Sequence, residues 1–160
     1  MARFTRRDLR GTYAPMIAVD TNVLVYAHRR EAKEHAVASR RLSQLASGNE
    51  PWAIPWPCVY EFFSVVTSRR IWQDAASTPA QAWQQIEAWL ASPSIELLSE
   101  TDDFASVLAP LLSRTRVVGA VVHDARVAGL CLAHGVDTLL TRDRDFSLFP
   151  ELTTDNPFAV

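Results

Sequence analysis

Several acidic residues stand where a carboxylate could take part in chemistry, because each follows an apolar run that predicts a buried strand. Asp20 comes directly after the apolar run 17–19, and Asp143 follows the pair 139–140 after two intervening residues. Ligands of an open parallel sheet bind beyond the carboxyl ends of its strands. Both acids are therefore expected on the edge of the sheet that carries function.

Two further acids are expected on the inner faces of helices. Asp124 lies near the start of a predicted helix over 122–134 and shares its face with apolar residues three, four and seven positions later. Glu61 lies one turn inside a helix that opens at Pro57, between Cys58 and Val65 on the same face. A carboxylate on an inner face costs free energy unless it is paired or bound to a metal.

Convergence of Asp20, Glu61, Asp124 and Asp143 at one edge predicts a cation site, because like charges packed together repel one another. No cluster of histidine or cysteine accompanies these acids, so the expected ligand set is all oxygen. Oxygen ligands favour Mg²⁺ or Mn²⁺ over Zn²⁺.

Each acid also has a simpler interpretation. Asp20 could cap the helix that starts after it, and Asp124 could be a helix N-cap. Asp143 and Asp145 could be turn residues in a solvated loop. Glu61 could pair with an arginine. The metal site therefore depends on the conjunction of the acids and on no single one of them.

The pattern along the chain is one of alternating strands and helices, which predicts an α/β fold with a parallel sheet covered on both faces. Expected strands cover residues 17–19, 52–54, 95–98, 138–140 and, more weakly, 152–153. Expected helices begin near residues 21, 32, 57, 79, 102 and 122. The helix near residue 57 opens at Pro57, and the one near residue 79 follows a capping box at Thr78 and Gln81. The helix near residue 102 is capped by Thr101 and has two acids in its first turn.

Composition sets the class of protein. The 160 residues are 48% hydrophobic and 21% charged, which predicts one domain with its own core and excludes a disordered or low-complexity chain. No apolar run approaches the ~18 residues of a membrane span. The net charge of −2 argues against a wholly basic nucleic-acid-coating protein. Cys58 and Cys131 are expected as buried reduced thiols of a cytoplasmic protein.

Residues 1–15 form a basic N-terminal extension without hydrophobic periodicity, and the domain is expected over 16–160. Arginines stand at positions 3, 6, 7 and 10. Either Met16 is the functional start, or the extension is an arm that contacts nucleic acid.

Tryptophan is frequent, and the five residues divide by position. Trp83 and Trp89 are expected in the core, whereas Trp52, Trp56 and Trp72 flank helix ends and predict an exposed apolar patch suited to a partner.

Four segments together resemble a known family. The run 17–27 (IAVDTNVLVYA) resembles the opening of PIN-domain proteins, and Glu61 within 59–62 resembles their second acid. Residues 123–128 (HDARVA) resemble the third-acid motif and 141–146 (TRDRDF) the terminal signature. Order, spacing and length are similar to the VapC-type toxin ribonucleases of bacterial toxin–antitoxin pairs, over about residues 16–158.

The resemblance implies a three-layer α/β/α sandwich around a mostly parallel sheet of four to five strands. It also implies an endoribonuclease that depends on Mg²⁺ or Mn²⁺, forms a homodimer and is silenced by a cognate antitoxin. Single-stranded or looped RNA is the expected substrate, because its backbone is accessible.

The same resemblance implies roles for individual residues. Asp20 and Asp124 would be the primary metal ligands, with Asp143, or in second place Asp145, completing the cluster. Glu61 would bind metal or orient water. The side chains implied to hold the carboxylates in place are those of Asn22 and Thr141. Arg126, beside the acids, is either a salt-bridge partner or a phosphate contact.

Other functions remain open from the sequence. One is an RNA-processing PIN-like nuclease that is not a toxin, and another is a non-catalytic module that keeps the fold. A metal-dependent phosphatase on a similar sheet is less favoured, because such a site usually needs a lysine facing it and the sole lysine, Lys33, lies away from the strand ends.

Overall fold

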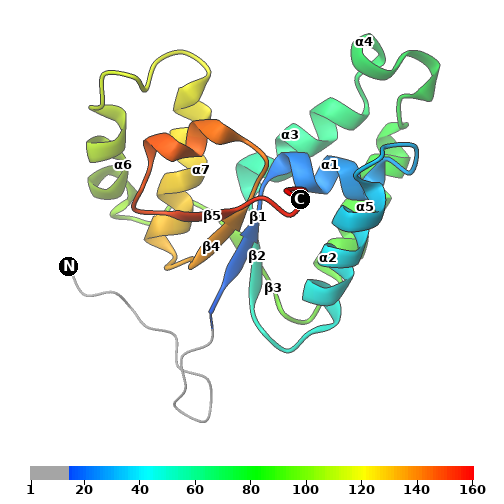
Figure 1. The fold of residues 1–160 in the computed structure, drawn as a ribbon, viewed down its shortest axis with the longest axis horizontal. Helices are drawn as coiled ribbons and strands as arrows, with labels where there is room; N and C mark the ends of the chain where they lie inside the picture. The colour runs from blue at the N-terminus through cyan, green and yellow to red at the C-terminus, as the bar shows by residue number, and fades with distance from the viewer. Residues whose placement is uncertain (1–14) are drawn as a thin grey trace.

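A sheet of five parallel strands forms the centre of the molecule (Figure 1). The computed structural model describes residues 15–160, so the predicted extension over 1–15 lies outside the described residues except for Pro15. The strands are β1 (Ile17–Val19), β2 (Trp52–Pro55), β3 (Ile95–Leu98), β4 (Thr138–Leu140) and β5 (Thr153–Asp155). Their order across the sheet is β3-β2-β1-β4-β5, and every neighbouring pair is parallel.

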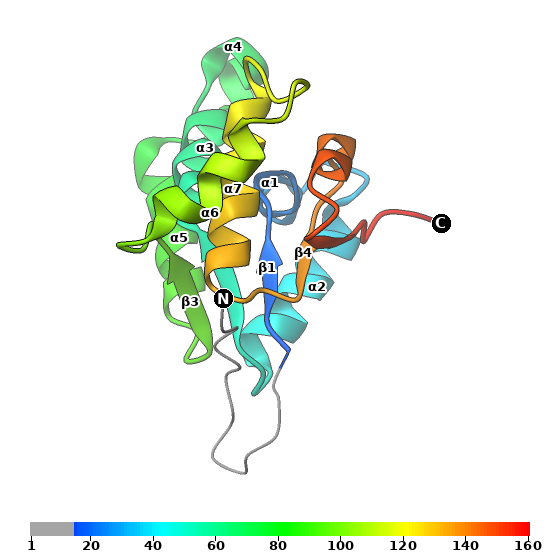
Figure 2. The same cartoon turned by 90° about the vertical axis from the view of Figure 1, so that its left-hand side faces the viewer.

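Helices cover both faces of this sheet, which confirms the predicted α/β/α sandwich (Figure 1 and Figure 2). The chain moves from β1 to β3 in one direction across the sheet and from β3 to β5 in the other. Right-handed crossovers then place the early helices on one face and the late helices on the opposite face. The early helices are α1 (Thr21–His28), α2 (His35–Ser47), α3 (Trp56–Val66), α4 (Arg69–Trp72) and α5 (Pro79–Leu90), with the 3₁₀ turn η1 (Gln73–Ala75). The late ones are α6 (Phe104–Leu112), α7 (Val121–Ala133) and the 3₁₀ turn η2 (Arg144–Leu148).

Local signals account for some of the helix ends. Thr78 and Gln81 form the predicted capping box at the start of α5, and Gly135, with φ of 68°, follows the end of α7. The start of α6 differs from the prediction. The Thr101 hydroxyl donates to the Asp103 carboxylate (2.7 Å), so Asp103 becomes the N-cap and the helix begins only at Phe104.

Trp52 and Trp83 lie where the sequence did not place them, and Trp56 and Trp72, expected in an exposed patch, are partly buried against the core. Trp52 is completely buried in β2, where its indole Nε1 donates to the Ser92 hydroxyl at 3.0 Å, so it belongs to no exposed patch. Trp83 is 47% exposed, because the buried stripe of α5 runs through Ala82 and Trp89 and leaves the residue after Ala82 on the outside. Trp89 is buried, as predicted.

The described part of the chain contains no helix that is both long and apolar enough to cross a membrane. Cys58 and Cys131 are buried free thiols, as predicted.

Candidate active site

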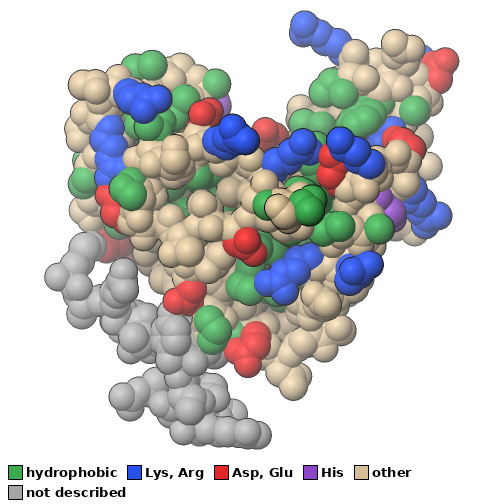
Figure 3. All heavy atoms as spheres, in the orientation of Figure 1, with side chains coloured by type: hydrophobic (Ala, Val, Ile, Leu, Met, Phe, Trp, Pro, Cys, Tyr) green, Lys and Arg blue, Asp and Glu red, His purple; other side chains and the backbone are tan. Residues whose placement is uncertain are grey.

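The candidate site lies at the carboxyl edge of the sheet, where the order of strands reverses between β1 and β4. Such a switch point is the usual ligand site of an open α/β sheet. The ends of the two strands are tied together, since the Asp20 backbone N–H donates to the Leu140 carbonyl at 3.0 Å. Figure 3 shows the molecule hollowed at this end, between the α6–α7 side and the α3–α4 arm, with charged side chains of both signs along the hollow.

Three carboxylates converge here. Asp124, Asp143 and Asp145 each offer an oxygen, and these oxygens lie within 4.8 Å of one another. Asp124 comes from the first turn of α7, whose N-cap is Ala120, so Asp124 is not the cap itself. Asp143 caps η2 by accepting a bond from the Asp145 backbone N–H at 2.8 Å. That turn brings both Asp143 and Asp145 to Asp124. The resemblance had placed Asp143 first and Asp145 second as the acid that completes the cluster.

Asp20 lies beside this cluster and is buried within a set of donors. Its Oδ2 accepts from the Thr141 hydroxyl (2.7 Å) and from Asn22 Nδ2 (3.0 Å). Its Oδ1 accepts from the Thr21 backbone N–H (2.8 Å) and from Cys58 Sγ (3.5 Å). Burial raises the pKa of Asp20, and the bonds from Thr141 and Thr21 oppose that rise. Asp20 therefore both caps α1 and is held at the candidate site.

The Thr141 hydroxyl connects the two strand ends. Besides donating to Asp20, it accepts from Asn22 Nδ2 (3.2 Å) and from the Asp143 backbone N–H (3.0 Å). Asn22 Oδ1 in turn accepts from the Arg142 backbone N–H at 3.0 Å. Thr141 and Asn22 thus fix the residues after β1 and β4 relative to one another, the Asp20 carboxylate included.

Glu61 differs from its prediction. It is an exposed residue, because α3 buries the neighbouring Val59 and Phe62 and turns the intervening positions outward. Its Oε2 accepts from the Thr21 hydroxyl at 2.9 Å, so its partner is a threonine and not an arginine. Glu61 lies outside the group of three close carboxylates, yet its charge still raises the pKa of Asp20.

The electrostatic cost of the cluster is concentrated on Asp124. Burial, followed by the charges of Asp143, Asp20, Asp145 and Glu61, raises its pKa from 3.8 to about 7. Negative charge at the site therefore exceeds what the surrounding side chains compensate, and a bound cation would relieve it.

Arg126 does not add positive charge to this cluster. Its Nε donates to Glu100 Oε1 at 2.7 Å and its Nη2 lies 2.5 Å from the same oxygen, so the salt-bridge interpretation describes this structure. Sequence reasoning missed two site residues, Thr21 and Cys58, which bond Glu61 and Asp20. Thr21 had one available signal, its place directly after Asp20 at the start of a helix.

The sequence also matches known proteins. The family model of the PIN domain matches residues 17–152. The VapC ribonuclease Mb2897 of Mycobacterium bovis is 36% identical over 142 residues, which are 89% of this chain and 95% of that protein.

Solved structures share the fold. VapBC2 from Rickettsia felis, bound to a DNA fragment from its promoter, has a TM-score of 0.63 at 20% identity and covers 88% of this chain and 98% of its own. VapC20 of Mycobacterium tuberculosis, a toxin that cleaves the sarcin–ricin loop, has a TM-score of 0.60 at 19% identity and covers 82% of this chain and 92% of its own. By its sequence match and its fold, this chain belongs to the PIN-domain family and, within it, to the VapC ribonucleases.

Proposed function

We propose that this protein is an endoribonuclease that hydrolyses RNA phosphodiester bonds with Mg²⁺ or Mn²⁺ and acts as the toxin of a toxin–antitoxin pair. The observation that carries the proposal is the convergence of Asp124, Asp143 and Asp145 within 4.8 Å at the switch point of the sheet. Carboxylates at this spacing repel one another strongly unless a cation lies between them.

The donor set fits a hard divalent cation. Asp124, Asp143 and Asp145 would hold it through carboxylate oxygens, the ligands that Mg²⁺ and Mn²⁺ prefer. Asp20 would complete the cluster from the end of β1. When bound, such a cation lowers the pKa of a water molecule and neutralises charge on a phosphate.

The chain's own residues would prepare this site. Thr141 and Asn22 hold the Asp20 carboxylate through bonds of 2.7 and 3.0 Å, so its oxygens do not need to reorganise when a substrate arrives. Glu61 is exposed and fixed by the Thr21 hydroxyl, which suits it to orient a water molecule and to accept its proton.

The partners follow from the same family. The solved VapBC complexes contain an antitoxin, and we propose that a cognate antitoxin also binds this chain, over the helices of its first half. On α3, Tyr60 is 65% exposed and stacks on the partly buried Trp56, with ring centroids 6.0 Å apart. Ile71, on the neighbouring α4, is 54% exposed. This apolar surface suits the interface of a homodimer.

Cleavage of a labelled single-stranded RNA tests the enzyme activity. We expect cleavage with Mg²⁺ or Mn²⁺ and none in EDTA. Asp124→Asn should reduce the rate by about 10²-fold or more, the scale for loss of a catalytic electrostatic group. Asp102→Asn makes the same chemical change at an exposed position and should leave the rate unchanged. Undiminished cleavage in EDTA, or by Asp124→Asn, would overturn the proposal.

Growth separates a toxin from an RNA-processing nuclease. Expression without the antitoxin should arrest growth, and Asp124→Asn should be tolerated. An active ribonuclease that leaves growth unaffected would favour the RNA-processing function. The homodimer is tested separately by light scattering, and a monomer at micromolar concentration would contradict it.

A further inference from the structure

Two cavities with common lining residues lie next to the acidic cluster and meet it at Asp143. A cavity of about 360 Å³ is lined by Asp143 and its neighbours, and a second of about 470 Å³ extends to Val37 and Phe158. Arg142, Arg144 and Asn156 line both cavities. We call this feature the Arg142–Arg144 groove. Volumes in this range are typical of ligand sites.

The charge of the groove is opposite to that of the acidic cluster. Its outer cavity is lined by three cationic side chains, those of Lys33, Arg142 and Arg144, and by one acid, Glu34. The acid is already engaged, since Arg142 Nη1 donates to Glu34 Oε1 at 2.8 Å and only 12% of the Glu34 side chain is exposed. The side chains of the outer cavity therefore carry a net positive charge, next to a site that is strongly negative.

Arg142 is held in a defined orientation. Its Nη1 also donates to the Tyr26 hydroxyl at 3.2 Å, and its guanidinium carbon lies 5.8 Å from the centre of the Tyr26 ring. Tyr26 itself packs edge-to-face on Phe158, with ring centroids 5.3 Å apart. Both bonds use Nη1, so the remaining edge of the guanidinium is available to bind a phosphate in a forked geometry.

The same segment connects the groove to the acids. Arg142 and Arg144 alternate with Asp143 and Asp145 along the chain after β4. The Arg142 backbone N–H donates to Asn22 Oδ1, and Asn22 also bonds Asp20. The segment that carries the two arginines is therefore fixed in position relative to the carboxylates. A subsite next to a reacting phosphate requires such fixed positions.

We propose that the Arg142–Arg144 groove is the subsite that holds the RNA strand on one side of the bond to be cut. Arg142 and Arg144 bind consecutive phosphates, and the apolar end formed by Val37 and Phe158 contacts a base. This inference rests on the proposed ribonuclease function. A nucleic-acid strand suits the groove better than a protein segment does, because Asp143 belongs both to the inner cavity and to the acidic cluster where a phosphate must react, and phosphates lie on both sides of that bond.

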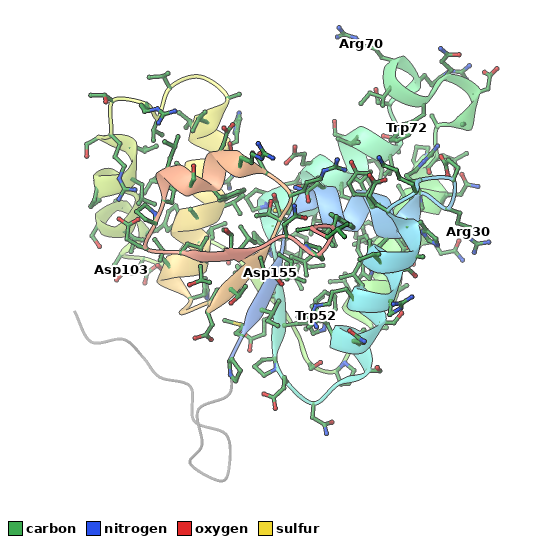
Figure 4. All side chains as sticks on the ribbon, viewed as in Figure 1. Arg30, Trp52, Arg70, Trp72, Asp103 and Asp155 are labelled. Carbon is green, nitrogen blue, oxygen red and sulfur yellow. The ribbon has the colours of Figure 1, made fainter. Side chains whose placement is uncertain are left out.

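The test measures binding of a fluorescein-labelled, single-stranded 12-nucleotide RNA by anisotropy, in the Asp124→Asn background so that the RNA stays intact. The test variant is Arg142→Gln/Arg144→Gln. The control, Arg40→Gln/Arg70→Gln, removes the same charge at two exposed residues outside the groove, and Figure 4 shows Arg70 at the outer end of α4.

We expect the groove variant to weaken RNA binding by about tenfold or more at low salt, the effect of losing charge-assisted contacts to phosphate. The slope of log K against log salt should become shallower by about 1.4, or ~0.7 for each lost phosphate contact on a single strand. The control should keep both the affinity and the slope within error of the parent.

Four results would overturn the inference. Equal weakening by both double variants would show a general effect of net charge. If the groove variant bound RNA normally while the protein with Asp124 intact cleaved RNA, this subsite would be refuted. The proposed ribonuclease function would then stand. Weakened antitoxin binding with normal RNA binding would make the groove a protein interface. A parent that neither binds nor cleaves RNA would refute the proposed function and this inference together.

Discussion

Replacing Asp124 by asparagine should stabilise the metal-free protein at pH 8 and leave its stability unchanged at pH 4. Asparagine has nearly the volume of aspartate, so the packing of α7 is retained while one negative charge is removed. The folded protein raises the pKa of Asp124 from 3.8 to about 7 through burial and the neighbouring acids. The native state therefore keeps a proton that the unfolded chain releases between these two values, and the native state loses stability as pH rises through this window.

The size of the effect follows from the same pKa values. The difference between 3.8 and about 7 would correspond to ~4 kcal/mol if the group were fully shielded from water. Asp124 is only partly buried, and solvent screening reduces this to about 1–2 kcal/mol. For a domain of this length, such a change raises the Tm by roughly 3–6 °C.

Thermal unfolding in EDTA at pH 4, 6 and 8 measures this difference. Asp124→Asn should gain stability over the parent progressively from pH 4 to pH 8, whereas the exposed control Asp102→Asn should follow the parent throughout. Adding Mn²⁺ at pH 8 should raise the Tm of the parent through mass action and raise that of Asp124→Asn less. A gain that does not depend on pH, or equal stabilisation of both proteins by Mn²⁺, would refute the reasoning.

Three further pairs of substitutions test the site and the packing that supports it. Thr141→Val removes the hydroxyl that joins the two strand ends and should cost about 1–3 kcal/mol in urea unfolding, with RNA cleavage lost as well, while Thr141→Ser should retain most of both. Arg29→Met removes a buried side chain that bonds the carbonyl of residue 75, so the segment 69–77 should be cut faster by thermolysin, whereas Arg30→Met, at the exposed position labelled in Figure 4, should not change the rate. Trp52→Phe should cost about 2–3 kcal/mol and Trp83→Phe less than ~0.5 kcal/mol in urea unfolding, and equal costs would contradict their assigned burial.

The sequence by itself determined the order of the strands and of the longer helices, and the position of two residues that follow strands. Short apolar runs such as 17–19 are typical of strands buried on both faces, and all five expected strands are present, with the last shifted to Thr153–Asp155. Since a residue directly after a parallel strand lies at its carboxyl edge, the places of Asp20 and Thr141 were predictable before any tertiary contact was known.

Only the tertiary structure decided which faces meet and which carboxylates come together. Periodicity shows which residues of a helix share a face, but it does not show which face packs against a neighbour. For this reason Glu61 was expected inside and is exposed, and Trp83 was expected in the core and is not. The turn after β4 brings Asp145 to Asp124 together with Asp143, because Asp143 bonds the backbone of Asp145 and thereby folds both acids toward α7. A contact of this kind joins segments distant in the chain, and the spacing of residues along the sequence carries no record of it.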